Sequence, residues 1–379
     1  MSEIIKKFAN NDYFYNPQEK KKSSLLWLFL FLIFMGIGLT LSILSREVPE
    51  FAPFYSTKIY PLWQGTLGRF SGLFPFSLSE AILYSLPVIL ILDIIFIIVR
   101  KRRRFSGVIK RILVFLSLLF CIYTANCGVN YFNKPFLVSE RVPIVEPNLP
   151  RIVQFCQYLV DELNHSSEEN MKGTSPQDYY PQGQELAEEA VEAMNRLGGI
   201  YPSLSGYYSK PKAITNSRPF SNMGVTGIYS PFTIEANYNR EMTPYNLPFT
   251  ACHELSHLKG YMDEGEANFI GFLACINSDN KAFNRSGLMM AWVYAGNELY
   301  RLDRDTFSKL RKSLPEDVIQ ELDDNNEFWE TYETKASEIQ DQINDAYLQY
   351  NGLEEGIVSY DTVTVMMVSW FFTSAEANI

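Results

Sequence analysis

Three long apolar stretches dominate the first third of the chain. Residues 23–45 contain no charged side chain, residues 78–99 contain two acidic ones, and residues 112–133 contain none. Each stretch is close to the roughly 20 residues that an α-helix needs to cross the hydrocarbon core of a bilayer. The pattern predicts three transmembrane helices. The length of the first stretch, and the two that follow it, argue against a cleaved signal peptide.

Basic residues lie on one side of these predicted helices. Five lysines precede the first stretch, and seven Lys and Arg residues lie between residues 100 and 111. Because short loops rich in Lys and Arg stay in the cytoplasm, the N-terminus and this loop are predicted to be cytoplasmic. An odd number of crossings then places the chain after residue 133 outside the cytoplasm.

Helical periodicity dominates the remainder of the chain. One segment, 226–237 (TGIYSPFTIEAN), is instead rich in β-branched and aromatic residues and is the best candidate for a strand, which Pro231 restricts to an edge or a bulge. Glu235 within it is expected to be a buried hydrogen-bonding acid rather than a substrate contact. Apolar residues recur at helical spacing in 152–163, 185–197, 248–259, 264–277, 285–302, 305–312, 315–323 and 327–349.

This pattern predicts a predominantly helical α+β protein. Its expected parts are a membrane domain at residues 1–133, a proline-rich connector at 134–150, and an outer domain at 151–379 that begins with helices and contains a small sheet. The segment 203–222 is expected to be a loop.

Charge and composition exclude several classes of protein. Residues 1–133 hold 15 Lys and Arg against 7 Asp and Glu, whereas the remaining residues hold 18 against 36. An acidic outer domain argues against nucleic-acid binding, which requires a basic face. The five cysteines form no CxxC pair, so a disulfide-rich scaffold or a cysteine zinc site is not supported. Cys156, Cys252 and Cys275 lie in the predicted outer part, where they allow at most one disulfide.

The candidate chemistry is concentrated in residues 251–269, which contain the pattern His253-Glu254-x-x-His257. On a helix the two histidines lie one turn apart on one face, so both imidazoles can reach one zinc ion, with Glu254 beside them. The chain has only three histidines, and two fall in this pattern. The third, His165, lies in a polar stretch and is expected to be a surface residue. A metal site explains the pattern better than a structural His pair in a packed helix.

Three carboxylates follow the second histidine closely. Gly260 is expected to end the first helix, and Asp263 with Glu266 has the spacing of a capping box at the start of the next. Glu264 is left over in the first turn of this second helix and is the expected third ligand, with Asn268 one turn later to orient a histidine. Asp263, which follows the glycine as in HExxHxxGxxD, and Glu266 stay open as alternatives.

Two histidines, one carboxylate and a water form the ligand set of a catalytic zinc site. We therefore expect Zn2+-dependent hydrolysis of a peptide bond, in which Glu254 acts as general base toward the zinc-activated water. No histidine follows His257, so the oxyanion donor must be another residue type, and Tyr360 and Tyr347 are candidates. The apolar run at 269–276 is too short to span a bilayer, so the site is expected outside the membrane.

The distinctive segments of the chain are PFSLSE at 75–80, CGVNY at 127–131, PFTIEAN at 231–237, residues 252–269, and Ser359-Tyr360. Together they resemble a bacterial family, the domain of unknown function 3810 group, which has three spans and an extracytoplasmic HExxH domain. The resemblance covers nearly the whole chain and implies that Glu264 and Glu266 belong to the family pattern, whereas the position of Asp263 is commonly not acidic. The string Glu264-x-x-Ala-Asn also resembles the second motif of the zinc-dependent gluzincins, with Asn268 in place of the usual Asp.

Together these observations favour a multi-pass protein of the bacterial cytoplasmic membrane whose zincin-like domain lies outside and acts as a zinc metalloendopeptidase. The expected partners are a peptide or protein substrate and the lipid bilayer, with no nucleic acid. The expected metal ligands are His253, His257 and Glu264, and the expected catalytic residues are Glu254 and Tyr360. The alternative is a membrane sensor or scaffold, in which the metal site is structural or inactive.

Overall fold

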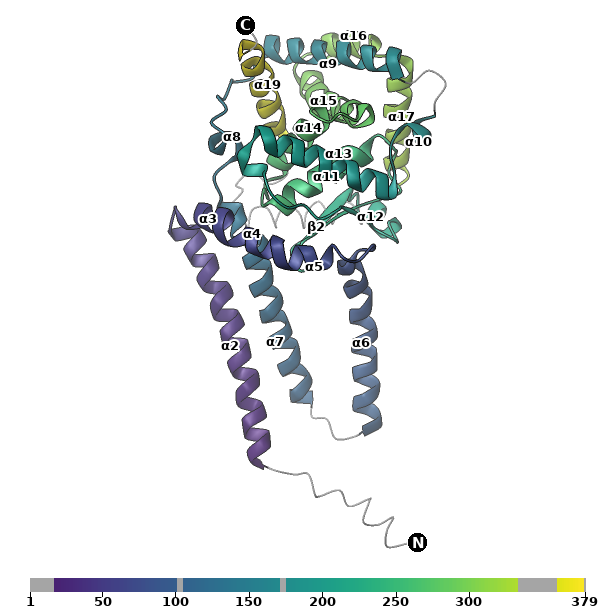
Figure 1. Cartoon of the computed structure of the whole chain (residues 1–379). Helices are drawn as coiled ribbons and strands as arrows, with labels where there is room; N and C mark the ends of the chain where they lie inside the picture. The colour runs from purple at the N-terminus through teal and green to yellow at the C-terminus, as the bar shows by residue number, and fades with distance from the viewer. Residues whose placement is uncertain (1–16, 101–104, 171–174, 333–359, 378–379) are drawn as a thin grey trace.

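The computed structural model describes residues 17–100, 105–170, 175–332 and 360–377. Figure 1 shows three long helices at one end of the molecule, a segment that crosses their ends, and a helical domain on the other side of this segment. The fold class predicted from the sequence, predominantly helical with a small sheet and three spans, is confirmed.

The three long helices are α2 (Pro17–Glu47), α6 (Leu78–Arg100) and α7 (Phe105–Tyr123). The stretches Leu25–Glu47, Leu78–Ile95 and Gly107–Phe132 have mean hydropathies of 2.4, 2.0 and 2.1, and each is long enough to cross a membrane. The last of them continues beyond α7 as the turns η4 (Thr124–Gly128) and η5 (Asn130–Phe132). The chain is therefore a membrane protein with three candidate transmembrane helices.

The segment between α2 and α6, for which no helix was predicted, is largely helical. It lies across the ends of the spanning helices and against the helical domain (Figure 1), and residues 51–76 are called the bridging segment below. Its elements are α3 (Phe51–Phe54), the π-helical turn η2 (Tyr55–Ile59), α4 (Tyr60–Trp63), the π-helical turn η3 (Gln64–Gly68) and α5 (Arg69–Ser71).

The helical domain follows the predicted helices closely. A break predicted near residue 325 is wrong, because α17 continues through it, and the part of the last predicted helix after residue 332 lies outside the described residues. Short helices also occur in the predicted connector and loop. The elements are α8 (Phe136–Ser139), α9 (Leu149–Asn170), α10 (Pro176–Tyr179), α11 (Gly183–Ile200), η6 (Pro202–Leu204), α12 (Arg218–Asn222), α13 (Asn246–Lys259), α14 (Glu264–Ile276), α15 (Lys281–Leu302), α16 (Arg304–Lys312), α17 (Glu316–Glu330) and α19 (Tyr360–Ala377).

The sheet has three short strands, β1 (Lys212–Ala213), β2 (Gly227–Ser230) and β3 (Glu235–Tyr238), in the order β1-β3-β2. The prediction of one strand over residues 226–237 is wrong, since the segment folds back as a hairpin in which Ser230 pairs with Glu235. Pro231 lies in the connecting turn, and Ile234 closes the turn with a positive φ of 51°. In the described sheet β2 is therefore an edge strand, while β3 also pairs in parallel with β1.

Helix α13 lies at the centre of the domain core. It contacts α14, α11, α15 and both β2 and β3, and 12 of its 14 residues are buried. On the far side of α15, the fully buried Arg285 forms ion pairs of 2.7 Å with Glu321 and 2.8 Å with Asp317, which join α15 to α17. All five cysteines are free thiols, so none of the outer cysteines forms the disulfide that their number allowed.

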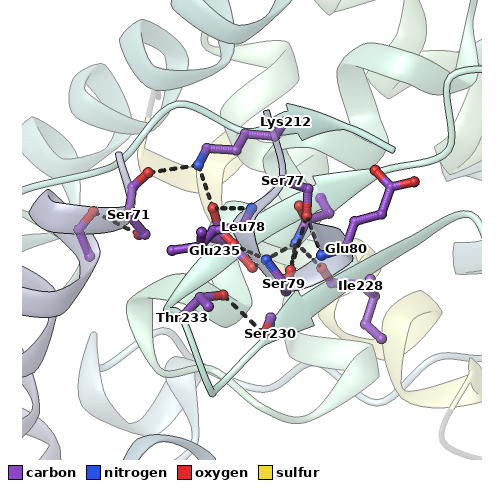
Figure 2. A network of polar contacts seen from close by, with 12 residues as sticks. Ser71, Ser77, Leu78, Ser79, Glu80, Lys212, Ile228, Ser230, Thr233 and Glu235 are labelled. Atoms are coloured by element: carbon purple, nitrogen blue, oxygen red, sulfur yellow. Dashed lines mark hydrogen bonds and ion pairs between the residues drawn. The ribbon is translucent and has the colours of Figure 1, made fainter. Parts of the chain in front are cut away.

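A polar network fastens the sheet to the start of α6 (Figure 2). The carboxylate of Glu235 accepts hydrogen bonds from the backbone amides of Leu78, at 3.1 Å, and Ser79, at 2.9 Å. It also forms an ion pair with Lys212, which in turn donates to the carbonyl of Ser71 at 2.7 Å. A carboxylate suits this place because the first amides of a helix lack helical partners and carry partial positive charge. Glu235 is 1% exposed, which confirms the expectation of a buried hydrogen-bonding acid.

Candidate metal centre

Two adjacent helices bring three possible metal ligands together. His253 and His257 lie on α13 with ring centroids 4.6 Å apart, and Glu264 is the first residue of α14. Glu264 Oε2 lies 3.4 Å from His253 Nε2, and Glu264 Oε1 lies 3.6 Å from His257 Nε2. One ligand atom from each residue lies within 4.8 Å of the others. Of the three predicted candidates for the third ligand, Glu264 is the one that faces both histidines.

A four-residue connection sets this geometry. Gly260 ends α13 in the left-handed region with φ 105°, and its amide and that of Tyr261 bond back to His257 and Ser256 carbonyls. Asp263 then caps α14 by accepting a hydrogen bond of 2.9 Å from the amide of Glu266, as the spacing predicted. The helix begins at the next residue, which places Glu264 at the end nearest α13.

The second half of the predicted capping box is wrong. Glu266 does not reach back to the start of its own helix, because its carboxylate accepts a hydrogen bond from the backbone amide of Phe136. This partner lies 130 residues away in the sequence, so local spacing could not indicate it. Burial raises the pKa of Glu266 to about 8. In the structure Glu266 thus points to the α8 region and Asp263 is engaged as a cap.

Close packing of α14 on α13 holds His253 in place. A side chain at Gly271 of α14 would put its Cβ 3.3 Å from the amide nitrogen and 3.4 Å from the Cα of His253. The absence of a side chain at this position lets the two helix backbones approach at the level of the metal-facing histidine.

The orientation of His257 is fixed by a backbone carbonyl. His257 Nδ1 lies 2.7 Å from the carbonyl oxygen of Tyr261, so in the neutral ring Nδ1 carries the proton and Nε2 presents its lone pair toward Glu264. The predicted role of Asn268 is wrong, since neither histidine hydrogen-bonds to it. His253 Nδ1 is buried and has no hydrogen-bond partner among the described residues.

Glu254 is buried beside the two histidines, with only 2% of its surface exposed. Burial raises the pKa of Glu254 to about 7, and the neighbouring imidazoles of His253 and His257 partly offset this rise. Its Oε2 is buried and, within the described part of the chain, has no hydrogen-bond partner. The side chain lies against Gly227 of β2, where a Cβ would overlap the carboxylate. A buried carboxyl with an unengaged oxygen and a pKa near neutrality is suited to accept a proton.

The donor set fits a zinc ion. Zinc bonds of about 2.0–2.1 Å in tetrahedral geometry place ligand atoms about 3.3 Å apart, close to the 3.4 and 3.6 Å measured between Glu264 and the histidines. Two imidazoles and one carboxylate are also a ligand set of catalytic zinc sites, which leave one position open. The side chains of Glu264 and His253 are 26% and 12% exposed, so the ligand cluster reaches the protein surface.

The other predicted residues fall outside this cluster or outside the described part of the chain. Tyr347 lies in an undescribed segment, and Tyr360 is the first residue of α19 with a side chain that is likewise outside the description. His165 is exposed on α9, away from the other two histidines, as expected of a surface residue.

Sequence reasoning missed three contributors to the site. Gly227 lies in a predicted strand, where a glycine can mark a close approach of another group, and this signal could have identified it. The carbonyl of Tyr261 has no sequence signal, because every residue has one. Tyr60 of the bridging segment donates a hydrogen bond of 2.9 Å to the carbonyl of Leu258, next to His257, although the two residues are 198 positions apart.

Comparison with known proteins identifies the chain at the level of a family. No curated protein and no solved structure matches it. The family described as "Protein of unknown function (DUF3810)" matches residues 55–368, which include most of the bridging segment, two of the spanning helices and the candidate metal centre. The match covers more than half of the chain and confirms the resemblance that its motifs indicated: the chain belongs to the DUF3810 family.

Proposed function

We propose that this protein is a membrane-anchored, zinc-dependent metallopeptidase. The observation that carries the proposal is the convergence of His253, His257 and Glu264 from two helices, at spacings suited to one zinc ion, beside a buried Glu254. A zinc ion bound by these three residues would lower the pKa of a water molecule toward 7 and polarise the carbonyl group of the scissile peptide bond.

Glu254 supplies the acid–base chemistry in this proposal. With a pKa of about 7 it is partly ionised at neutral pH, so it can take a proton from the attacking water and give it to the leaving amine nitrogen. The bond from the water oxygen to the carbonyl carbon forms, and the carbon–nitrogen bond breaks. Gly227 keeps space for the carboxylate, and the hydrogen bond from His257 to Tyr261 keeps Nε2 of that histidine available as a ligand.

The sheet offers a place for an extended substrate. Strand β2 pairs with β3 alone among the described strands, and edge strands can pair with an added peptide strand. Since Gly227 of β2 contacts Glu254, a peptide paired along β2 would pass close to the general base. This arrangement supports a peptide or protein as the substrate.

The test uses the full-length protein in lipid nanodiscs. We expect about one zinc ion per chain by elemental analysis and cleavage of an unbiased peptide mixture detected by mass spectrometry. Glu254→Gln should keep the zinc and abolish cleavage, whereas Glu162→Gln, an exposed substitution on α9, should change neither. A wild-type protein that binds zinc but cleaves nothing would favour the sensor or scaffold function, and a folded protein that binds no zinc would contradict the peptidase function.

We also propose that the catalytic domain lies outside the cytoplasm. Basic residues precede the first span and fill the loop between the second and third, and such loops stay in the cytoplasm. A reporter that is active only in the cytoplasm, fused after residue 140 in a bacterial host, should be silent. The same reporter at the N-terminus should be active, and the reverse pattern would contradict the topology.

A further inference from the structure

The bridging segment begins and ends at the same membrane surface. It connects the end of α2 to the start of α6, and both are candidate transmembrane helices. In Figure 1 it lies across the ends of the spanning helices, with the helical domain on its opposite side. A segment tied to the membrane at both ends has one side toward the bilayer and one toward the domain.

The side away from the bilayer is a continuous buried stripe, which packs on the turns η4 and η5 and the end of α2 at its start and on the helical domain from Tyr60 onward. Its members recur at intervals of three to five residues, and the five-residue interval from Tyr55 to Tyr60 coincides with the π-helical turn η2, which contains more residues per turn than an α-helix. At Gly68 the backbone comes so close to the domain that a Cβ would lie 3.3 Å from Ile234. The buried residues are Ala52, Tyr55, Tyr60, Gln64, Gly68 and Ser71.

The opposite side is apolar and aromatic. Residues 51–77 contain no Asp or Glu, and Lys58 and Arg69 are the charged residues in this range. Exposed patches of large apolar side chains mark membrane or protein interaction sites, and Trp with other aromatic residues is enriched where lipid meets water. The exposed fractions are 56% for Phe54, 66% for Leu62, 44% for Trp63, 53% for Phe70, 78% for Leu73 and 45% for Phe76.

The candidate metal centre rests directly on this segment. Tyr60 donates a hydrogen bond of 2.9 Å to the carbonyl of Leu258 on α13, and Gln64 donates to the same oxygen. The ring of Tyr60 also lies within 3.4 Å of the position a Cβ would take at Gly260. A helix with its side chains is about 10–12 Å across. The segment and half of α13 together therefore separate the ligands from the lipid by on the order of 15 Å.

We propose that the bridging segment lies in the lipid–water interface of the bilayer and holds the metal centre at a fixed short height, so that its substrates are polypeptides cut close to their own membrane attachment. The occupant of the apolar face is the bilayer that the flanking helices cross, because the face is continuous with them and carries no negative charge. The substrate class rests on the proposed peptidase function, whereas the interfacial position does not.

The interfacial position of the bridging segment is tested without any activity measurement. In the Trp27→Phe background, which removes the tryptophan of the first span, nanodiscs of lipids brominated near the glycerol end should quench part of the tryptophan emission. Adding Trp63→Phe should abolish that quenched fraction, because the remaining tryptophans lie in the helical domain. Equal quenching with and without Trp63 would overturn the proposal and indicate that another protein surface covers the apolar face.

The substrate class is tested in proteoliposomes with one random-sequence peptide mixture in two forms, with and without an N-terminal palmitoyl chain. An extended chain advances about 3.3 Å per residue, so about five residues reach 15 Å. We expect the anchored form to be cleaved at least about tenfold faster, since anchoring raises the effective concentration. Its cleavage sites should lie about 5–15 residues from the anchor, and detergent should remove both effects.

The possible failures are distinguishable. Equal cleavage of both forms, or cleavage spread evenly along the anchored peptides, would overturn the substrate class and leave the peptidase function intact. Cleavage of neither form, by protein that shows the Trp63-dependent quenching, would overturn the peptidase function and with it the substrate class, while the interfacial position would stand.

Discussion

Gly227 on the edge strand β2 lies against the carboxylate of Glu254 on α13, so closely that a Cβ at this position would overlap it. Gly227→Ala should therefore displace the carboxylate without unfolding the domain, because the atoms that must move are the end of a flexible side chain. We expect peptide hydrolysis to fall about 10- to 100-fold, since a misplacement of about 1 Å can cost that much. Zinc content and thermal midpoint should stay near those of the wild type.

Gly199→Ala is the matched control, because nothing lies within 4 Å of a Cβ at that position on α11. It should leave hydrolysis and zinc content unchanged and should not lower stability, since Ala favours a helix more than Gly does. If Gly227→Ala hydrolysed peptides at the wild-type rate, the position of Glu254 against β2 would be irrelevant to its proposed role as general base.

The third zinc ligand can be identified by replacing each candidate carboxylate with its amide. Glu264→Gln should weaken zinc binding by more than the roughly 10- to 100-fold typical of groups that only orient a ligand. Asp263→Asn should leave the zinc affinity unchanged, because Asn caps a helix as well as Asp does. Glu266→Gln should also leave it unchanged, since this carboxyl faces the amide of Phe136.

Zinc affinities of the three variants are measured by competition with a chromogenic chelator, and their folding by circular dichroism. A folded Glu266→Gln or Asp263→Asn variant that loses zinc while Glu264→Gln retains it would assign the ligand differently from the geometry of the histidines and Glu264.

Periodic and spaced features of the fold could be predicted from the sequence, but features set by distant partners could not. The spans, the helices around the HExxH pattern and the cap at Asp263 depend on residues within one or two turns, which leave a local signal. The bridging segment was missed because its π-helical turns lengthen the interval between buried residues beyond the usual helical period. The β2–β3 hairpin was missed because its turn places Ile234, a β-branched residue, at positive φ, where Gly or Asn would be expected.

The candidate site likewise contains residues with a local sequence signal and groups whose role is set by distant parts of the chain. The pair His253 and His257 with Glu254 is recognisable because one helix carries all three. Spacing favoured Glu264 as the third ligand but left Asp263 and Glu266 open, because the partner of Glu266 is the distant amide of Phe136. The groups that orient them are a backbone carbonyl at Tyr261 and a strand at Gly227. Their role depends on the tertiary structure, so it cannot be predicted from residue spacing.

Zinc affinity should rise with pH. In the metal-free protein burial alone would lower the pKa of His257, but the carboxylate of Glu264 outweighs it and raises this pKa to about 9. Below that pH the imidazole carries a proton that zinc must displace. Between about pH 7.5 and 9, where Glu254 with its pKa of about 7 is already mostly ionised, we expect the affinity to rise at least about tenfold per pH unit, since His257 loses one proton and ionisation of the zinc-bound water adds to the slope.

Calorimetry in two buffers of different ionisation enthalpy gives the number of protons released per zinc ion. At about pH 8 His257 contributes about one proton to this number and the zinc-bound water contributes up to one more, and the number falls by about one above the pKa of His257. An affinity that does not change over this range would show that His257 is already neutral in the metal-free protein.

The buried pair Lys212–Glu235 should contribute strongly to the attachment of the sheet to α6. Their side chains are 6% and 1% exposed, so Lys212→Met would leave a buried carboxylate without its cation, a change that costs about 3–5 kcal/mol. Lys210, two residues earlier, forms a 2.7 Å pair with Glu188 in which both side chains are about half exposed, so Lys210→Met should destabilise the protein far less. Thermal unfolding of both variants in detergent should therefore show a shift of several degrees for Lys212→Met and little for Lys210→Met.

The double variant Lys212→Met/Glu235→Gln should be destabilised by less than the sum of its single changes, because the second removes the charge that the first leaves unpaired. Strict additivity would mean that the amides of Leu78 and Ser79 alone satisfy the carboxylate.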